Sequence, residues 1–305
     1  MEPLSSLLAK PALEVLGEPL LASGWRLLAG ARCESITVNT HRHPDQVAAA
    51  ARQMDPEGRL LQLSYEERLL GGAGGVAAVR FAGTNEPFLV ANADIWANLD
   101  LRTLRRINSH DAIHLALLPH PDPNRWRSVV LDASGRVDDI LEPGVIDPRP
   151  RYLFSGVQRL GGMVTDGLPD PPCEWAEVWQ ERQAAGKLFG LIVQGRWHEG
   201  GDPEAYRRLV LSLLPGQHSW VHPGARVAGS AVLLHCAVGK GCLVAAGVQL
   251  TSSVLTAGAR ANSGTCLAEC VVAGRVTLEA VVAQGQLILP DRHVPLPMSG
   301  LPGQN

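Results

Sequence analysis

The C-terminal part of the chain most constrains its fold, because small and β-branched residues recur there about every six positions. Charged residues are scarce between residues 220 and 290, and helical patterns of apolar residues stop there. Such a repeat predicts a hexapeptide β-helix, in which three short strands form one triangular coil and each coil buries its apolar residues by stacking on the next. The predicted repeat positions are Val221, Val227, Leu233, Val238, Leu243, Val248 and Val254.

Turns between such short strands often need a positive φ, which favours glycine. The glycines expected at the turns are Gly224, Gly229, Gly239, Gly241 and Gly247. A β-sandwich with irregular spacing is the alternative, and the persistence of the repeat favours the β-helix because sandwich strands are usually longer. We therefore predict a β-helix over residues 216–290, followed by a loose proline-rich tail over 291–305.

Residues 1–215 show a different pattern, in which helix-like and strand-like segments alternate. Helical spacing of apolar or small residues appears at 19–29 and 43–54. Short apolar or β-branched runs predict strands at 35–39, 87–92, 112–118 and 188–193. This alternation predicts an α/β domain with a mostly parallel sheet and helices on both faces. Ligands of such sheets gather beyond the carboxyl ends of the strands.

Three segments of this domain carry candidate functional groups. Leu70–Gly75 is a glycine-rich turn entering a helix, where backbone N–H groups can approach a ligand, although many such turns are simply tight loops. Asp94 follows a predicted strand and suits Mg²⁺, the alternative being a cap of a following helix. Glu199, in the segment 197–204 before a helix, could supply a second carboxylate to the same metal, which prefers oxygen ligands to the neighbouring His198.

Composition excludes several classes of protein. The net charge is −3, so no basic surface indicates nucleic acid, and no apolar run approaches the length of a membrane span. The N-terminus carries an early Glu2 and lacks the basic start of a secretory signal. The six cysteines form no CxxC pair and are expected to be reduced core thiols. These features predict a cytoplasmic protein.

Taken in order, several segments resemble the sugar-1-phosphate nucleotidyltransferase family, specifically its mannose-1-phosphate guanylyltransferase and N-acetylmuramate-1-phosphate uridylyltransferase branches. The segment 9–20 resembles the family's PKPLLPVxGxPL, and 38–41 matches its VNTH. Leu70–Gly75 is similar to LGTAGG, and 92–94 stands where the family has Asn-Gly-Asp. Residues 154–157 resemble FSGI, and 197–203 resemble WxDxGTP. The family often carries a C-terminal left-handed β-helix, so the resemblance covers nearly the whole chain.

The resemblance implies a role for each matching residue and a Mg²⁺ cofactor. Lys10 and Asp94 are the catalytic residues. Lys10 contacts phosphate, Asp94 binds the metal, and Glu199 completes the metal site. The sugar phosphate is bordered by Glu142 and Gly156. The nucleotide is received by Gly71, Gly72, Ala73, Gly74, Gly75 and Asn92.

The chain also departs from the family pattern. The strand and the GxGTRL loop that precede the first matching segment in the family do not appear ahead of Pro3. That loop cradles the triphosphate, and its strand is central in the sheet, so two neighbouring strands would each lose a partner. Either the natural protein starts upstream of Met1, or the sheet is rebuilt and the protein no longer catalyses. Smaller departures are Ala9 for proline, Gly72 for threonine, Ala93 for glycine and Glu199 for aspartate.

The resemblance implies an enzyme that joins a nucleoside triphosphate and a sugar 1-phosphate to give an NDP-sugar and pyrophosphate, of GDP-mannose or UDP-amino-sugar type. The alternative is a catalytically inactive binding or regulatory subunit, which the missing loop favours. Acyl transfer by the β-helix is a third possibility, disfavoured because only His222 and His235 could serve as its base. The flat, uncharged faces of the β-helix predict a homo-oligomer.

Overall fold

The computed structural model describes residues 3–58, 60–79 and 86–296. The chain divides into two compact units, one made of residues 23–197 and the other of residues 1–22 together with 198–305. The second unit therefore combines both ends of the chain, whereas the sequence predicted a boundary near residue 215. That predicted boundary between the two domains stays a prediction. The proline-rich tail lies outside the described residues from 297 onward.

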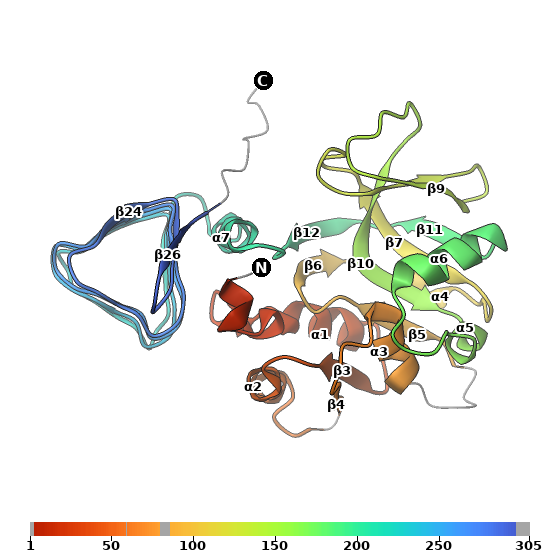
Figure 1. Cartoon of the computed structure of the whole chain (residues 1–305), viewed down its shortest axis with the longest axis horizontal. Coiled ribbons are helices and arrows are strands. Elements are labelled where there is room, and N and C mark those ends of the chain that lie inside the picture. The colour runs from red at the N-terminus through yellow and green to blue at the C-terminus, as the bar shows by residue number, and fades with distance from the viewer. Residues whose placement is uncertain (1–2, 59, 80–85, 297–305) are drawn as a thin grey trace. The chain divides into compact units, whose positions relative to one another are not determined.

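The unit of residues 23–197 alternates helices and strands, as predicted (Figure 1). Its helices are α1 (Leu21–Gly30), α2 (Pro44–Met54), α3 (Gly72–Val79), α4 (Arg102–Arg106), α5 (Gly162–Asp166) and α6 (Trp175–Ala184). Its strands are β3 (Ile36–Thr40), β4 (Leu61–Tyr65), β5 (Phe88–Ala91), β6 (Ile95–Leu99), β7 (Ile113–Pro119), β8 (Ser128–Leu131), β9 (Val137–Leu141), β10 (Tyr152–Leu160) and β11 (Leu188–Ile192). The boundary between the two units falls within the last strand, β12 (Gly195–Glu199).

The main sheet has the order β11-β7-β10-β8-β9, with β5 also pairing with β10. Strand β11 is parallel to β7, whereas β10 is antiparallel to β5, β7 and β8. The sheet is therefore more mixed than the sequence predicted, because β10 runs against its neighbours. Strands β3 and β4 form a separate parallel pair, and β6 pairs with β12. Among the described residues β3 pairs only with β4, and β5 only with β10.

Successive residues of β7 point to opposite faces of the sheet and belong to two apolar cores. Leu115 packs with residues of α3, α5 and α6 on one face. Leu118 packs with Leu27 of α1 and Leu104 of α4 on the other face. Helices thus cover both faces of the sheet, which confirms the predicted α/β, Rossmann-like class.

The second unit begins with two short 3₁₀ helices, η1 (Leu4–Ser6) and η2 (Lys10–Ala12), and a hairpin of β1 (Glu14–Val15) and β2 (Glu18–Pro19). Gly17 in the hairpin turn has φ +90°, and a Cβ there would lie 3.2 Å from the indole of Trp220. Helix α7 (Pro203–Ser212) starts at Asp202, whose carboxylate accepts from the N–H of Ala205 at 2.7 Å. The hydroxyl of the fully buried Tyr206 donates to the carbonyl of Glu14, so α7 anchors the hairpin.

The rest of this unit is a left-handed parallel β-helix, seen end-on as a triangle in Figure 1. Its strands are β13 (Trp220–Val221), β14 (Arg226–Val227), β15 (Val232–Leu234), β16 (Ala237–Val238), β17 (Leu243–Val244), β18 (Gln249–Thr251), β19 (Val254–Leu255), β20 (Arg260–Ala261), β21 (Cys266–Ala268), β22 (Val271–Val272), β23 (Thr277–Leu278), β24 (Val282–Gln284) and β25 (Gln286–Ile288). The closing strand β26 (His293–Pro295) is antiparallel to β25.

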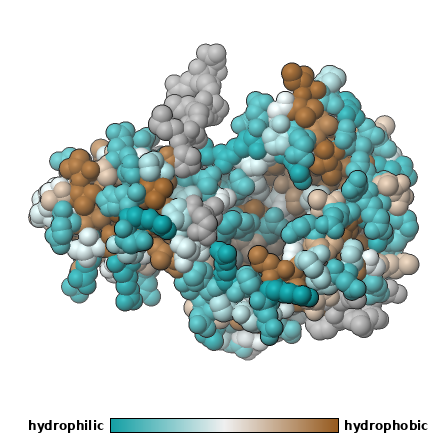
Figure 2. All heavy atoms as spheres, viewed as in Figure 1, coloured by the Kyte–Doolittle hydropathy of each residue, from teal (hydrophilic) through white to brown (hydrophobic). Residues whose placement is uncertain are grey.

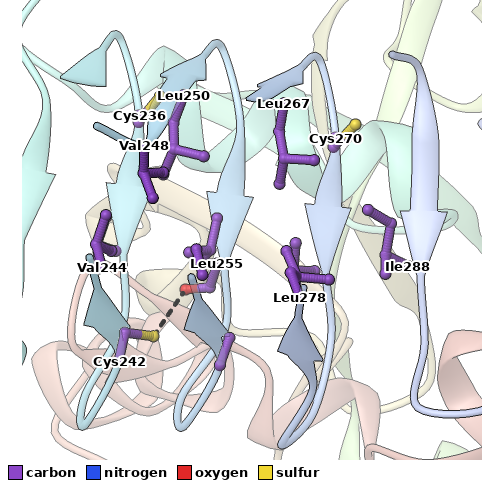
Figure 3. Packing of buried hydrophobic residues seen from close by; sticks show 14 of the residues in the cluster. Cys236, Cys242, Val244, Val248, Leu250, Leu255, Leu267, Cys270, Leu278 and Ile288 are labelled. Carbon is purple, nitrogen blue, oxygen red and sulfur yellow. Dashed lines mark hydrogen bonds between the residues drawn. The ribbon is translucent and has the colours of Figure 1, made fainter. Parts of the chain in front are cut away.

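The coil of this β-helix takes 17 residues, because Trp220 pairs with Ala237 and Ala237 with Val254. The predicted six-residue repeat therefore drifts out of phase by one residue in each coil. The core-facing residues are Val227, Leu233, Val238, Val244, Leu250 and Leu255, followed by their partners in later coils (Figure 3).

Two predicted repeat positions were consequently wrong. The side chain of Leu243 is 37% exposed, and its neighbour Val244 takes the core position. Val254 is buried outside that core, on a strand that contacts α7, whereas Leu255 faces inward. The predicted positions step by five residues before Leu243 and again before Val248, whereas the core positions step by six there, from Val238 to Val244 and Leu250.

The core positions take a shorter step, of five residues before Val238 and before Leu255, at a corner where non-glycine residues adopt positive φ. His235, Ser252 and Glu269 have φ of 53°, 45° and 54°, and they recur every 17 residues. At the other two corners Gly241 and Gly247 have positive φ, as predicted. The predicted Gly224, Gly229 and Gly239 do not have positive φ.

All six cysteines are free thiols, and Cys173, Cys236, Cys242 and Cys270 are buried. Burial raises the pKa of each of these four thiols, which keeps them protonated. Figure 3 shows three of them within the packing of the β-helix. They act as small core residues, as the sequence predicted.

Candidate active site

The predicted metal residue Asp94 lies in the turn between β5 and β6. Because the element that follows this turn is a strand, Asp94 does not cap a helix, and that alternative was wrong. The N–H of Asn92, at the start of the turn, donates to the carbonyl of Gly156 at 2.8 Å. Two segments that are about 60 residues apart in the chain are thereby joined at the carboxyl end of β5.

Gly156 is the contact point on the opposite strand, β10. Its φ is +82°, and a Cβ there would lie 2.9 Å from Cδ1 of Ile95 and 3.2 Å from Nδ2 of Asn92. The pairing of β10 with β7 shifts between Phe154 and Gln158, so Gly156 sits in a bulge. Bulges next to functional sites re-aim the chain, and here the bulge brings the backbone of β10 against the Asn92 turn.

The predicted glycine-rich turn leads into α3, as expected. Its first N–H groups have partners within the chain. The N–H of Gly72 donates to Oε2 of Glu174 at 3.1 Å. The N–H groups of Ala73 and Gly74 donate to the carbonyl of Cys173 at 3.1 and 3.0 Å. The peptide 173–174 thus occupies the amino end of α3, where a carboxylate is favoured by the helix dipole.

The glycines of this turn are required by the same contacts. A Cβ on Gly71 would lie 2.4 Å from the carbonyl oxygen of Cys173, and one on Gly72 would lie 2.7 Å from Cδ1 of Trp175. Real Cβ atoms do not approach other atoms this closely, so any side chain would push the segment 173–175 away. Close packing within the protein alone therefore explains glycine at 71 and 72.

Gly75 faces a different pair of groups. A Cβ there would lie 2.8 Å from both Nδ2 of Asn39 and Oε1 of Glu66. Asn39 Nδ2 donates to this oxygen at 2.7 Å, and the N–H of Leu70 donates to Oε2 at 3.2 Å. Glu66 is 5% exposed and follows β4 directly, so this buried carboxylate ties β3 to the glycine turn.

Sequence reasoning missed Glu66, Glu174 and Trp175. Glu66 directly follows β4, a strand that the sequence pattern did not predict, so attention to the residues after predicted strands did not reach it. Glu174 and Trp175 gave no such signal, since they lie about 100 residues from the turn that they contact.

The predicted sugar residue Glu142 is exposed at the end of the β8–β9 hairpin. Its carboxylate binds Arg127 through two bonds, 2.7 Å to Nη2 and 3.1 Å to Nε. The sequence did not indicate Arg127, because Arg127 and Glu142 come together only when β8 and β9 pair as a hairpin. The side chains of Arg127 and Glu142 are 58% and 63% exposed, so this pair contributes little to stability.

The predicted phosphate and second metal residues, Lys10 and Glu199, belong to the other unit. Lys10 is the first residue of η2 and half-buried. Glu199 is the last residue of β12, and a Cβ on Gly201 would lie 2.9 Å from its Oε1. Glycine at 201 therefore leaves room for the Glu199 carboxylate.

Within residues 3–58, 60–79 and 86–296, no group of three or more His, Cys, Asp or Glu side chains is placed to hold a metal. Mg²⁺ does not need such a group, because one or two carboxylates with waters and substrate phosphates complete its octahedron. Asp94 and Glu199 each carry a carboxylate, the kind of oxygen donor that Mg²⁺ prefers.

Comparison with known proteins identifies the class. A family model described as nucleotidyl transferase matches residues 1–156, which is more than half of the 305-residue chain. The chain therefore belongs to the nucleotidyl transferase family, a family of enzymes, and its homologues are sugar-1-phosphate nucleotidyltransferases.

Two relatives illustrate this similarity. A mannose-1-phosphate guanylyltransferase of Mycobacterium tuberculosis is 28% identical over 292 residues, covering 88% of this chain and 79% of the relative. A probable mannose-1-phosphate guanylyltransferase of Oryza sativa is 23% identical over 304 residues, covering 91% and 84%. The chain thus spans most of the length of both relatives.

Solved structures confirm the fold. HddC from Yersinia pseudotuberculosis is similar with a TM-score of 0.59 at 18% identity, covering 69% of this chain and 94% of that chain. A putative glucose-1-phosphate thymidylyltransferase from Bacillus anthracis is similar with a TM-score of 0.58 at 16% identity, covering 69% and 88%. In the described part of the chain, no helix has the length and apolar character of a membrane span.

Proposed function

We propose that this protein transfers a nucleotidyl group from a nucleoside triphosphate to a sugar 1-phosphate. A phosphate oxygen of the sugar 1-phosphate attacks the α-phosphorus, a new P–O bond forms, and pyrophosphate leaves. Membership in the nucleotidyl transferase family supports this reaction. The observation that carries it is the Asn92–Gly156 contact, which holds the Asp94 turn at the carboxyl end of β5.

The protein's share of this reaction is positioning and charge neutralisation. Asp94 and Glu199 would hold Mg²⁺, which neutralises phosphate charge when bound, and Lys10 would steady a phosphate. Glu142 and the bulge at Gly156 would border the sugar phosphate. The nucleotide would lie against Asn92 and the turn formed by Gly71, Gly72, Ala73, Gly74 and Gly75.

Both relatives named above are mannose-1-phosphate guanylyltransferases, which favours GTP and mannose 1-phosphate as the substrates. A UDP-amino-sugar product is the second possibility from the sequence. Pyrophosphate release should be measured with GTP and with UTP, each with mannose 1-phosphate or an N-acetyl amino-sugar 1-phosphate. The proposal expects release that requires both a triphosphate and a sugar phosphate.

The Asp94→Asn variant tests the metal assignment in the same assay. Because one carboxylate charge at the phosphates is lost, turnover should fall by roughly a hundredfold or more, with the melting temperature unchanged. Asp100→Asn is the matched control, since Asp100 is a surface residue whose side chain binds Arg102. If Asp94→Asn were as active as Asp100→Asn, the metal assignment would be wrong.

A binding or regulatory subunit is the second candidate function. One observation favours it. The first N–H groups of α3 already donate to Cys173 and Glu174, so they are not available to a nucleotide. A subunit of this kind would bind nucleotide sugar in calorimetry but release no pyrophosphate from any triphosphate.

We further propose that the β-helix associates with a second copy of itself. The outward residues of β15, β18, β21 and β24 carry no charge, and they are Val232, Leu234, Gln249, Thr251, Cys266, Ala268, Val282 and Gln284. Figure 2 shows apolar residues at the surface of the β-helix, and the side chain of Val282 is 78% exposed. An uncharged face complements itself in a two-fold contact. Val282→Glu should shift the sedimentation coefficient toward a monomer, whereas Thr277→Glu, on another face, should not.

The six free thiols suit a reducing compartment, so we propose a cytoplasmic protein. Its partners would then be small-molecule substrates and a second copy of the chain.

A further inference from the structure

Two neighbouring side chains at the start of α6 lie directly against the glycine turn. Measured from the position that a Cβ on Gly72 would take, Nε1 of Trp175 is 3.0 Å away and Oε2 of Glu174 is 3.6 Å away. A side-chain donor and a side-chain carboxylate therefore flank one point on the turn. Glycine at 72, where the family resemblance leads one to expect threonine, leaves room for the indole.

Both groups have hydrogen-bonding capacity to spare. Among the described residues no hydrogen bond to Nε1 of Trp175 is formed, and this side chain is half-buried against the apolar core. Glu174 is exposed, and only its Oε2 accepts a hydrogen bond within the described chain, from the N–H of Gly72. An indole N–H can only donate, and an ionised carboxylate can only accept.

This combination discriminates among the nucleobases. The Watson–Crick edge of guanine presents one acceptor, O6, followed by two donors, N1–H and N2–H. Uracil presents a carbonyl, one N–H and a second carbonyl, so a carboxylate near that second carbonyl would repel it. Adenine and cytosine place an acceptor nitrogen at the centre of the edge, where a carboxylate cannot bond to it.

We propose that Glu174 and Trp175 read guanine at the glycine turn, with the indole N–H donating to O6 and the carboxylate accepting from N1–H and N2–H. This inference rests on the proposed function, and it deepens that function by fixing the base. It makes both residues specificity determinants that touch the substrate.

The test uses the full-length protein and compares GTP with UTP. Glu174→Gln keeps an oxygen that can accept from the N–H of Gly72 but replaces the other acceptor with a donor. We expect kcat/KM for GTP to fall about 10- to 100-fold and that for UTP to stay the same or rise, because the site loses an acceptor for guanine. Trp175→Phe keeps an aromatic side chain, although a smaller one, and removes the N–H, so it should lower GTP use about tenfold or less.

Glu177→Gln is the matched control, since it removes the same charge from α6 three residues further on. It should leave the ratio of GTP to UTP use unchanged. Melting temperatures of all three variants show whether the fold is kept, and nucleotide affinity by calorimetry gives a second readout.

The outcomes separate the inference from the proposed function. If the wild-type protein used UTP in preference to GTP, or if Glu174→Gln left the GTP to UTP ratio unchanged, guanine reading by this pair would be wrong while the transferase function stood. If no triphosphate gave pyrophosphate, the proposed function would fail. Calorimetry would then decide the inference, which requires GTP to bind more tightly than UTP and Glu174→Gln to lose that preference.

Discussion

Several glycines of the α/β unit lie where another segment of the chain comes against their Cα atoms, whereas Gly241 and Gly247 of the β-helix have positive φ in open space. A Cβ on Gly71 would collide with the carbonyl of Cys173, but nothing lies within 4 Å of such a Cβ on Gly247, whose φ is +73°. At positions such as Gly71, glycine in the first unit allows close approach between distant segments. The second unit uses it for a backbone conformation that recurs in each coil.

This difference follows from how each unit is built. In the α/β unit a bond such as Gly72 to Glu174 joins residues 102 positions apart, so each close approach is unique. In the β-helix a corner repeats after 17 residues. The equivalent corner positions therefore share one backbone conformation but can carry different side chains. The corner at His235, Ser252 and Glu269 shows that the conformation tolerates other residues at some cost.

The largest effect is expected for Gly195→Ala in the α/β unit. A Cβ there would lie 2.1 Å from the carbonyl oxygen of Asn98, and φ is +149°. Because backbone must move, the free energy of unfolding should fall by roughly 2–5 kcal/mol. Gly144→Ala is the control, with φ +81° but nothing within 4 Å, and it should cost only about 1 kcal/mol. Equal losses in urea unfolding would show that close approach is not what Gly195 provides.

Acid should destabilise the α/β unit before the β-helix. Burial, together with the nearby Arg159, lowers the pKa of His114 to about 4. Because the folded state holds this imidazole neutral, its contribution to stability is present above pH 6.5 and is lost as pH falls from about 6.5 toward 4. Allowing for partial exposure, the loss is on the order of 2 kcal/mol.

Hydrogen exchange at pH 7 and pH 5 measures this loss separately in β7 and in the β-helix. The variant His114→Phe places an aromatic ring where the imidazole stacks on Phe189 but cannot be protonated, so β7 should lose its pH dependence. His293→Phe, a change at an exposed residue of β26, should leave the pH dependence of exchange in β7 unchanged. The same acid sensitivity in β7 of His114→Phe would exclude His114 as the cause.

A smaller loss is expected for Gly247→Ala in the β-helix. Only the positive φ opposes a side chain here, so the free energy of unfolding should fall by about 1 kcal/mol. Thermal unfolding followed by circular dichroism measures it against Gly229→Ala, where no positive φ applies and nothing lies within 4 Å. If Gly247→Ala lowered the free energy of unfolding as much as Gly195→Ala, glycine would not serve different purposes in the two units.

The smallest effect should be a gain. Ser252→Gly removes the side chain from a residue with φ 45° and so relieves its backbone strain. The hydrogen bonds of Ser252 use its backbone N–H and carbonyl, so glycine keeps them. The free energy of unfolding should rise by about 0.5 kcal/mol, because relief of the left-handed conformation outweighs the added freedom of the unfolded chain. A decrease in the melting temperature would mean that this corner is not strained.

Much of the fold could be predicted because its patterns are local. The helix at 43–54 and the strands near 36, 88, 113 and 188 appeared close to their predicted ranges. The β-helix was also predicted, but its phase was not. Leu243 and Val244 are both aliphatic, as are Val254 and Leu255, so apolar composition cannot show which of each pair faces the core.

The candidate site could be predicted in part for the same reason. Asn92 and Gly156 stand in segments that match known motifs, and the structure joins them. The contacts of Glu174 and Trp175 with the glycine turn depend on how α6 packs beside α3, which no local pattern encodes. The bond between Glu142 and Arg127 likewise depends on the hairpin formed by β8 and β9.

Pyrophosphate release from GTP and mannose 1-phosphate, measured in parallel on the wild-type protein and on Asp94→Asn, tests the proposed function most directly. Release by the wild-type protein should depend on both substrates, and it should fall at least a hundredfold in the variant. Equal release by both proteins would contradict the role of the Asp94 turn. No release by a folded wild-type protein that still binds nucleotide sugar would instead support a regulatory subunit.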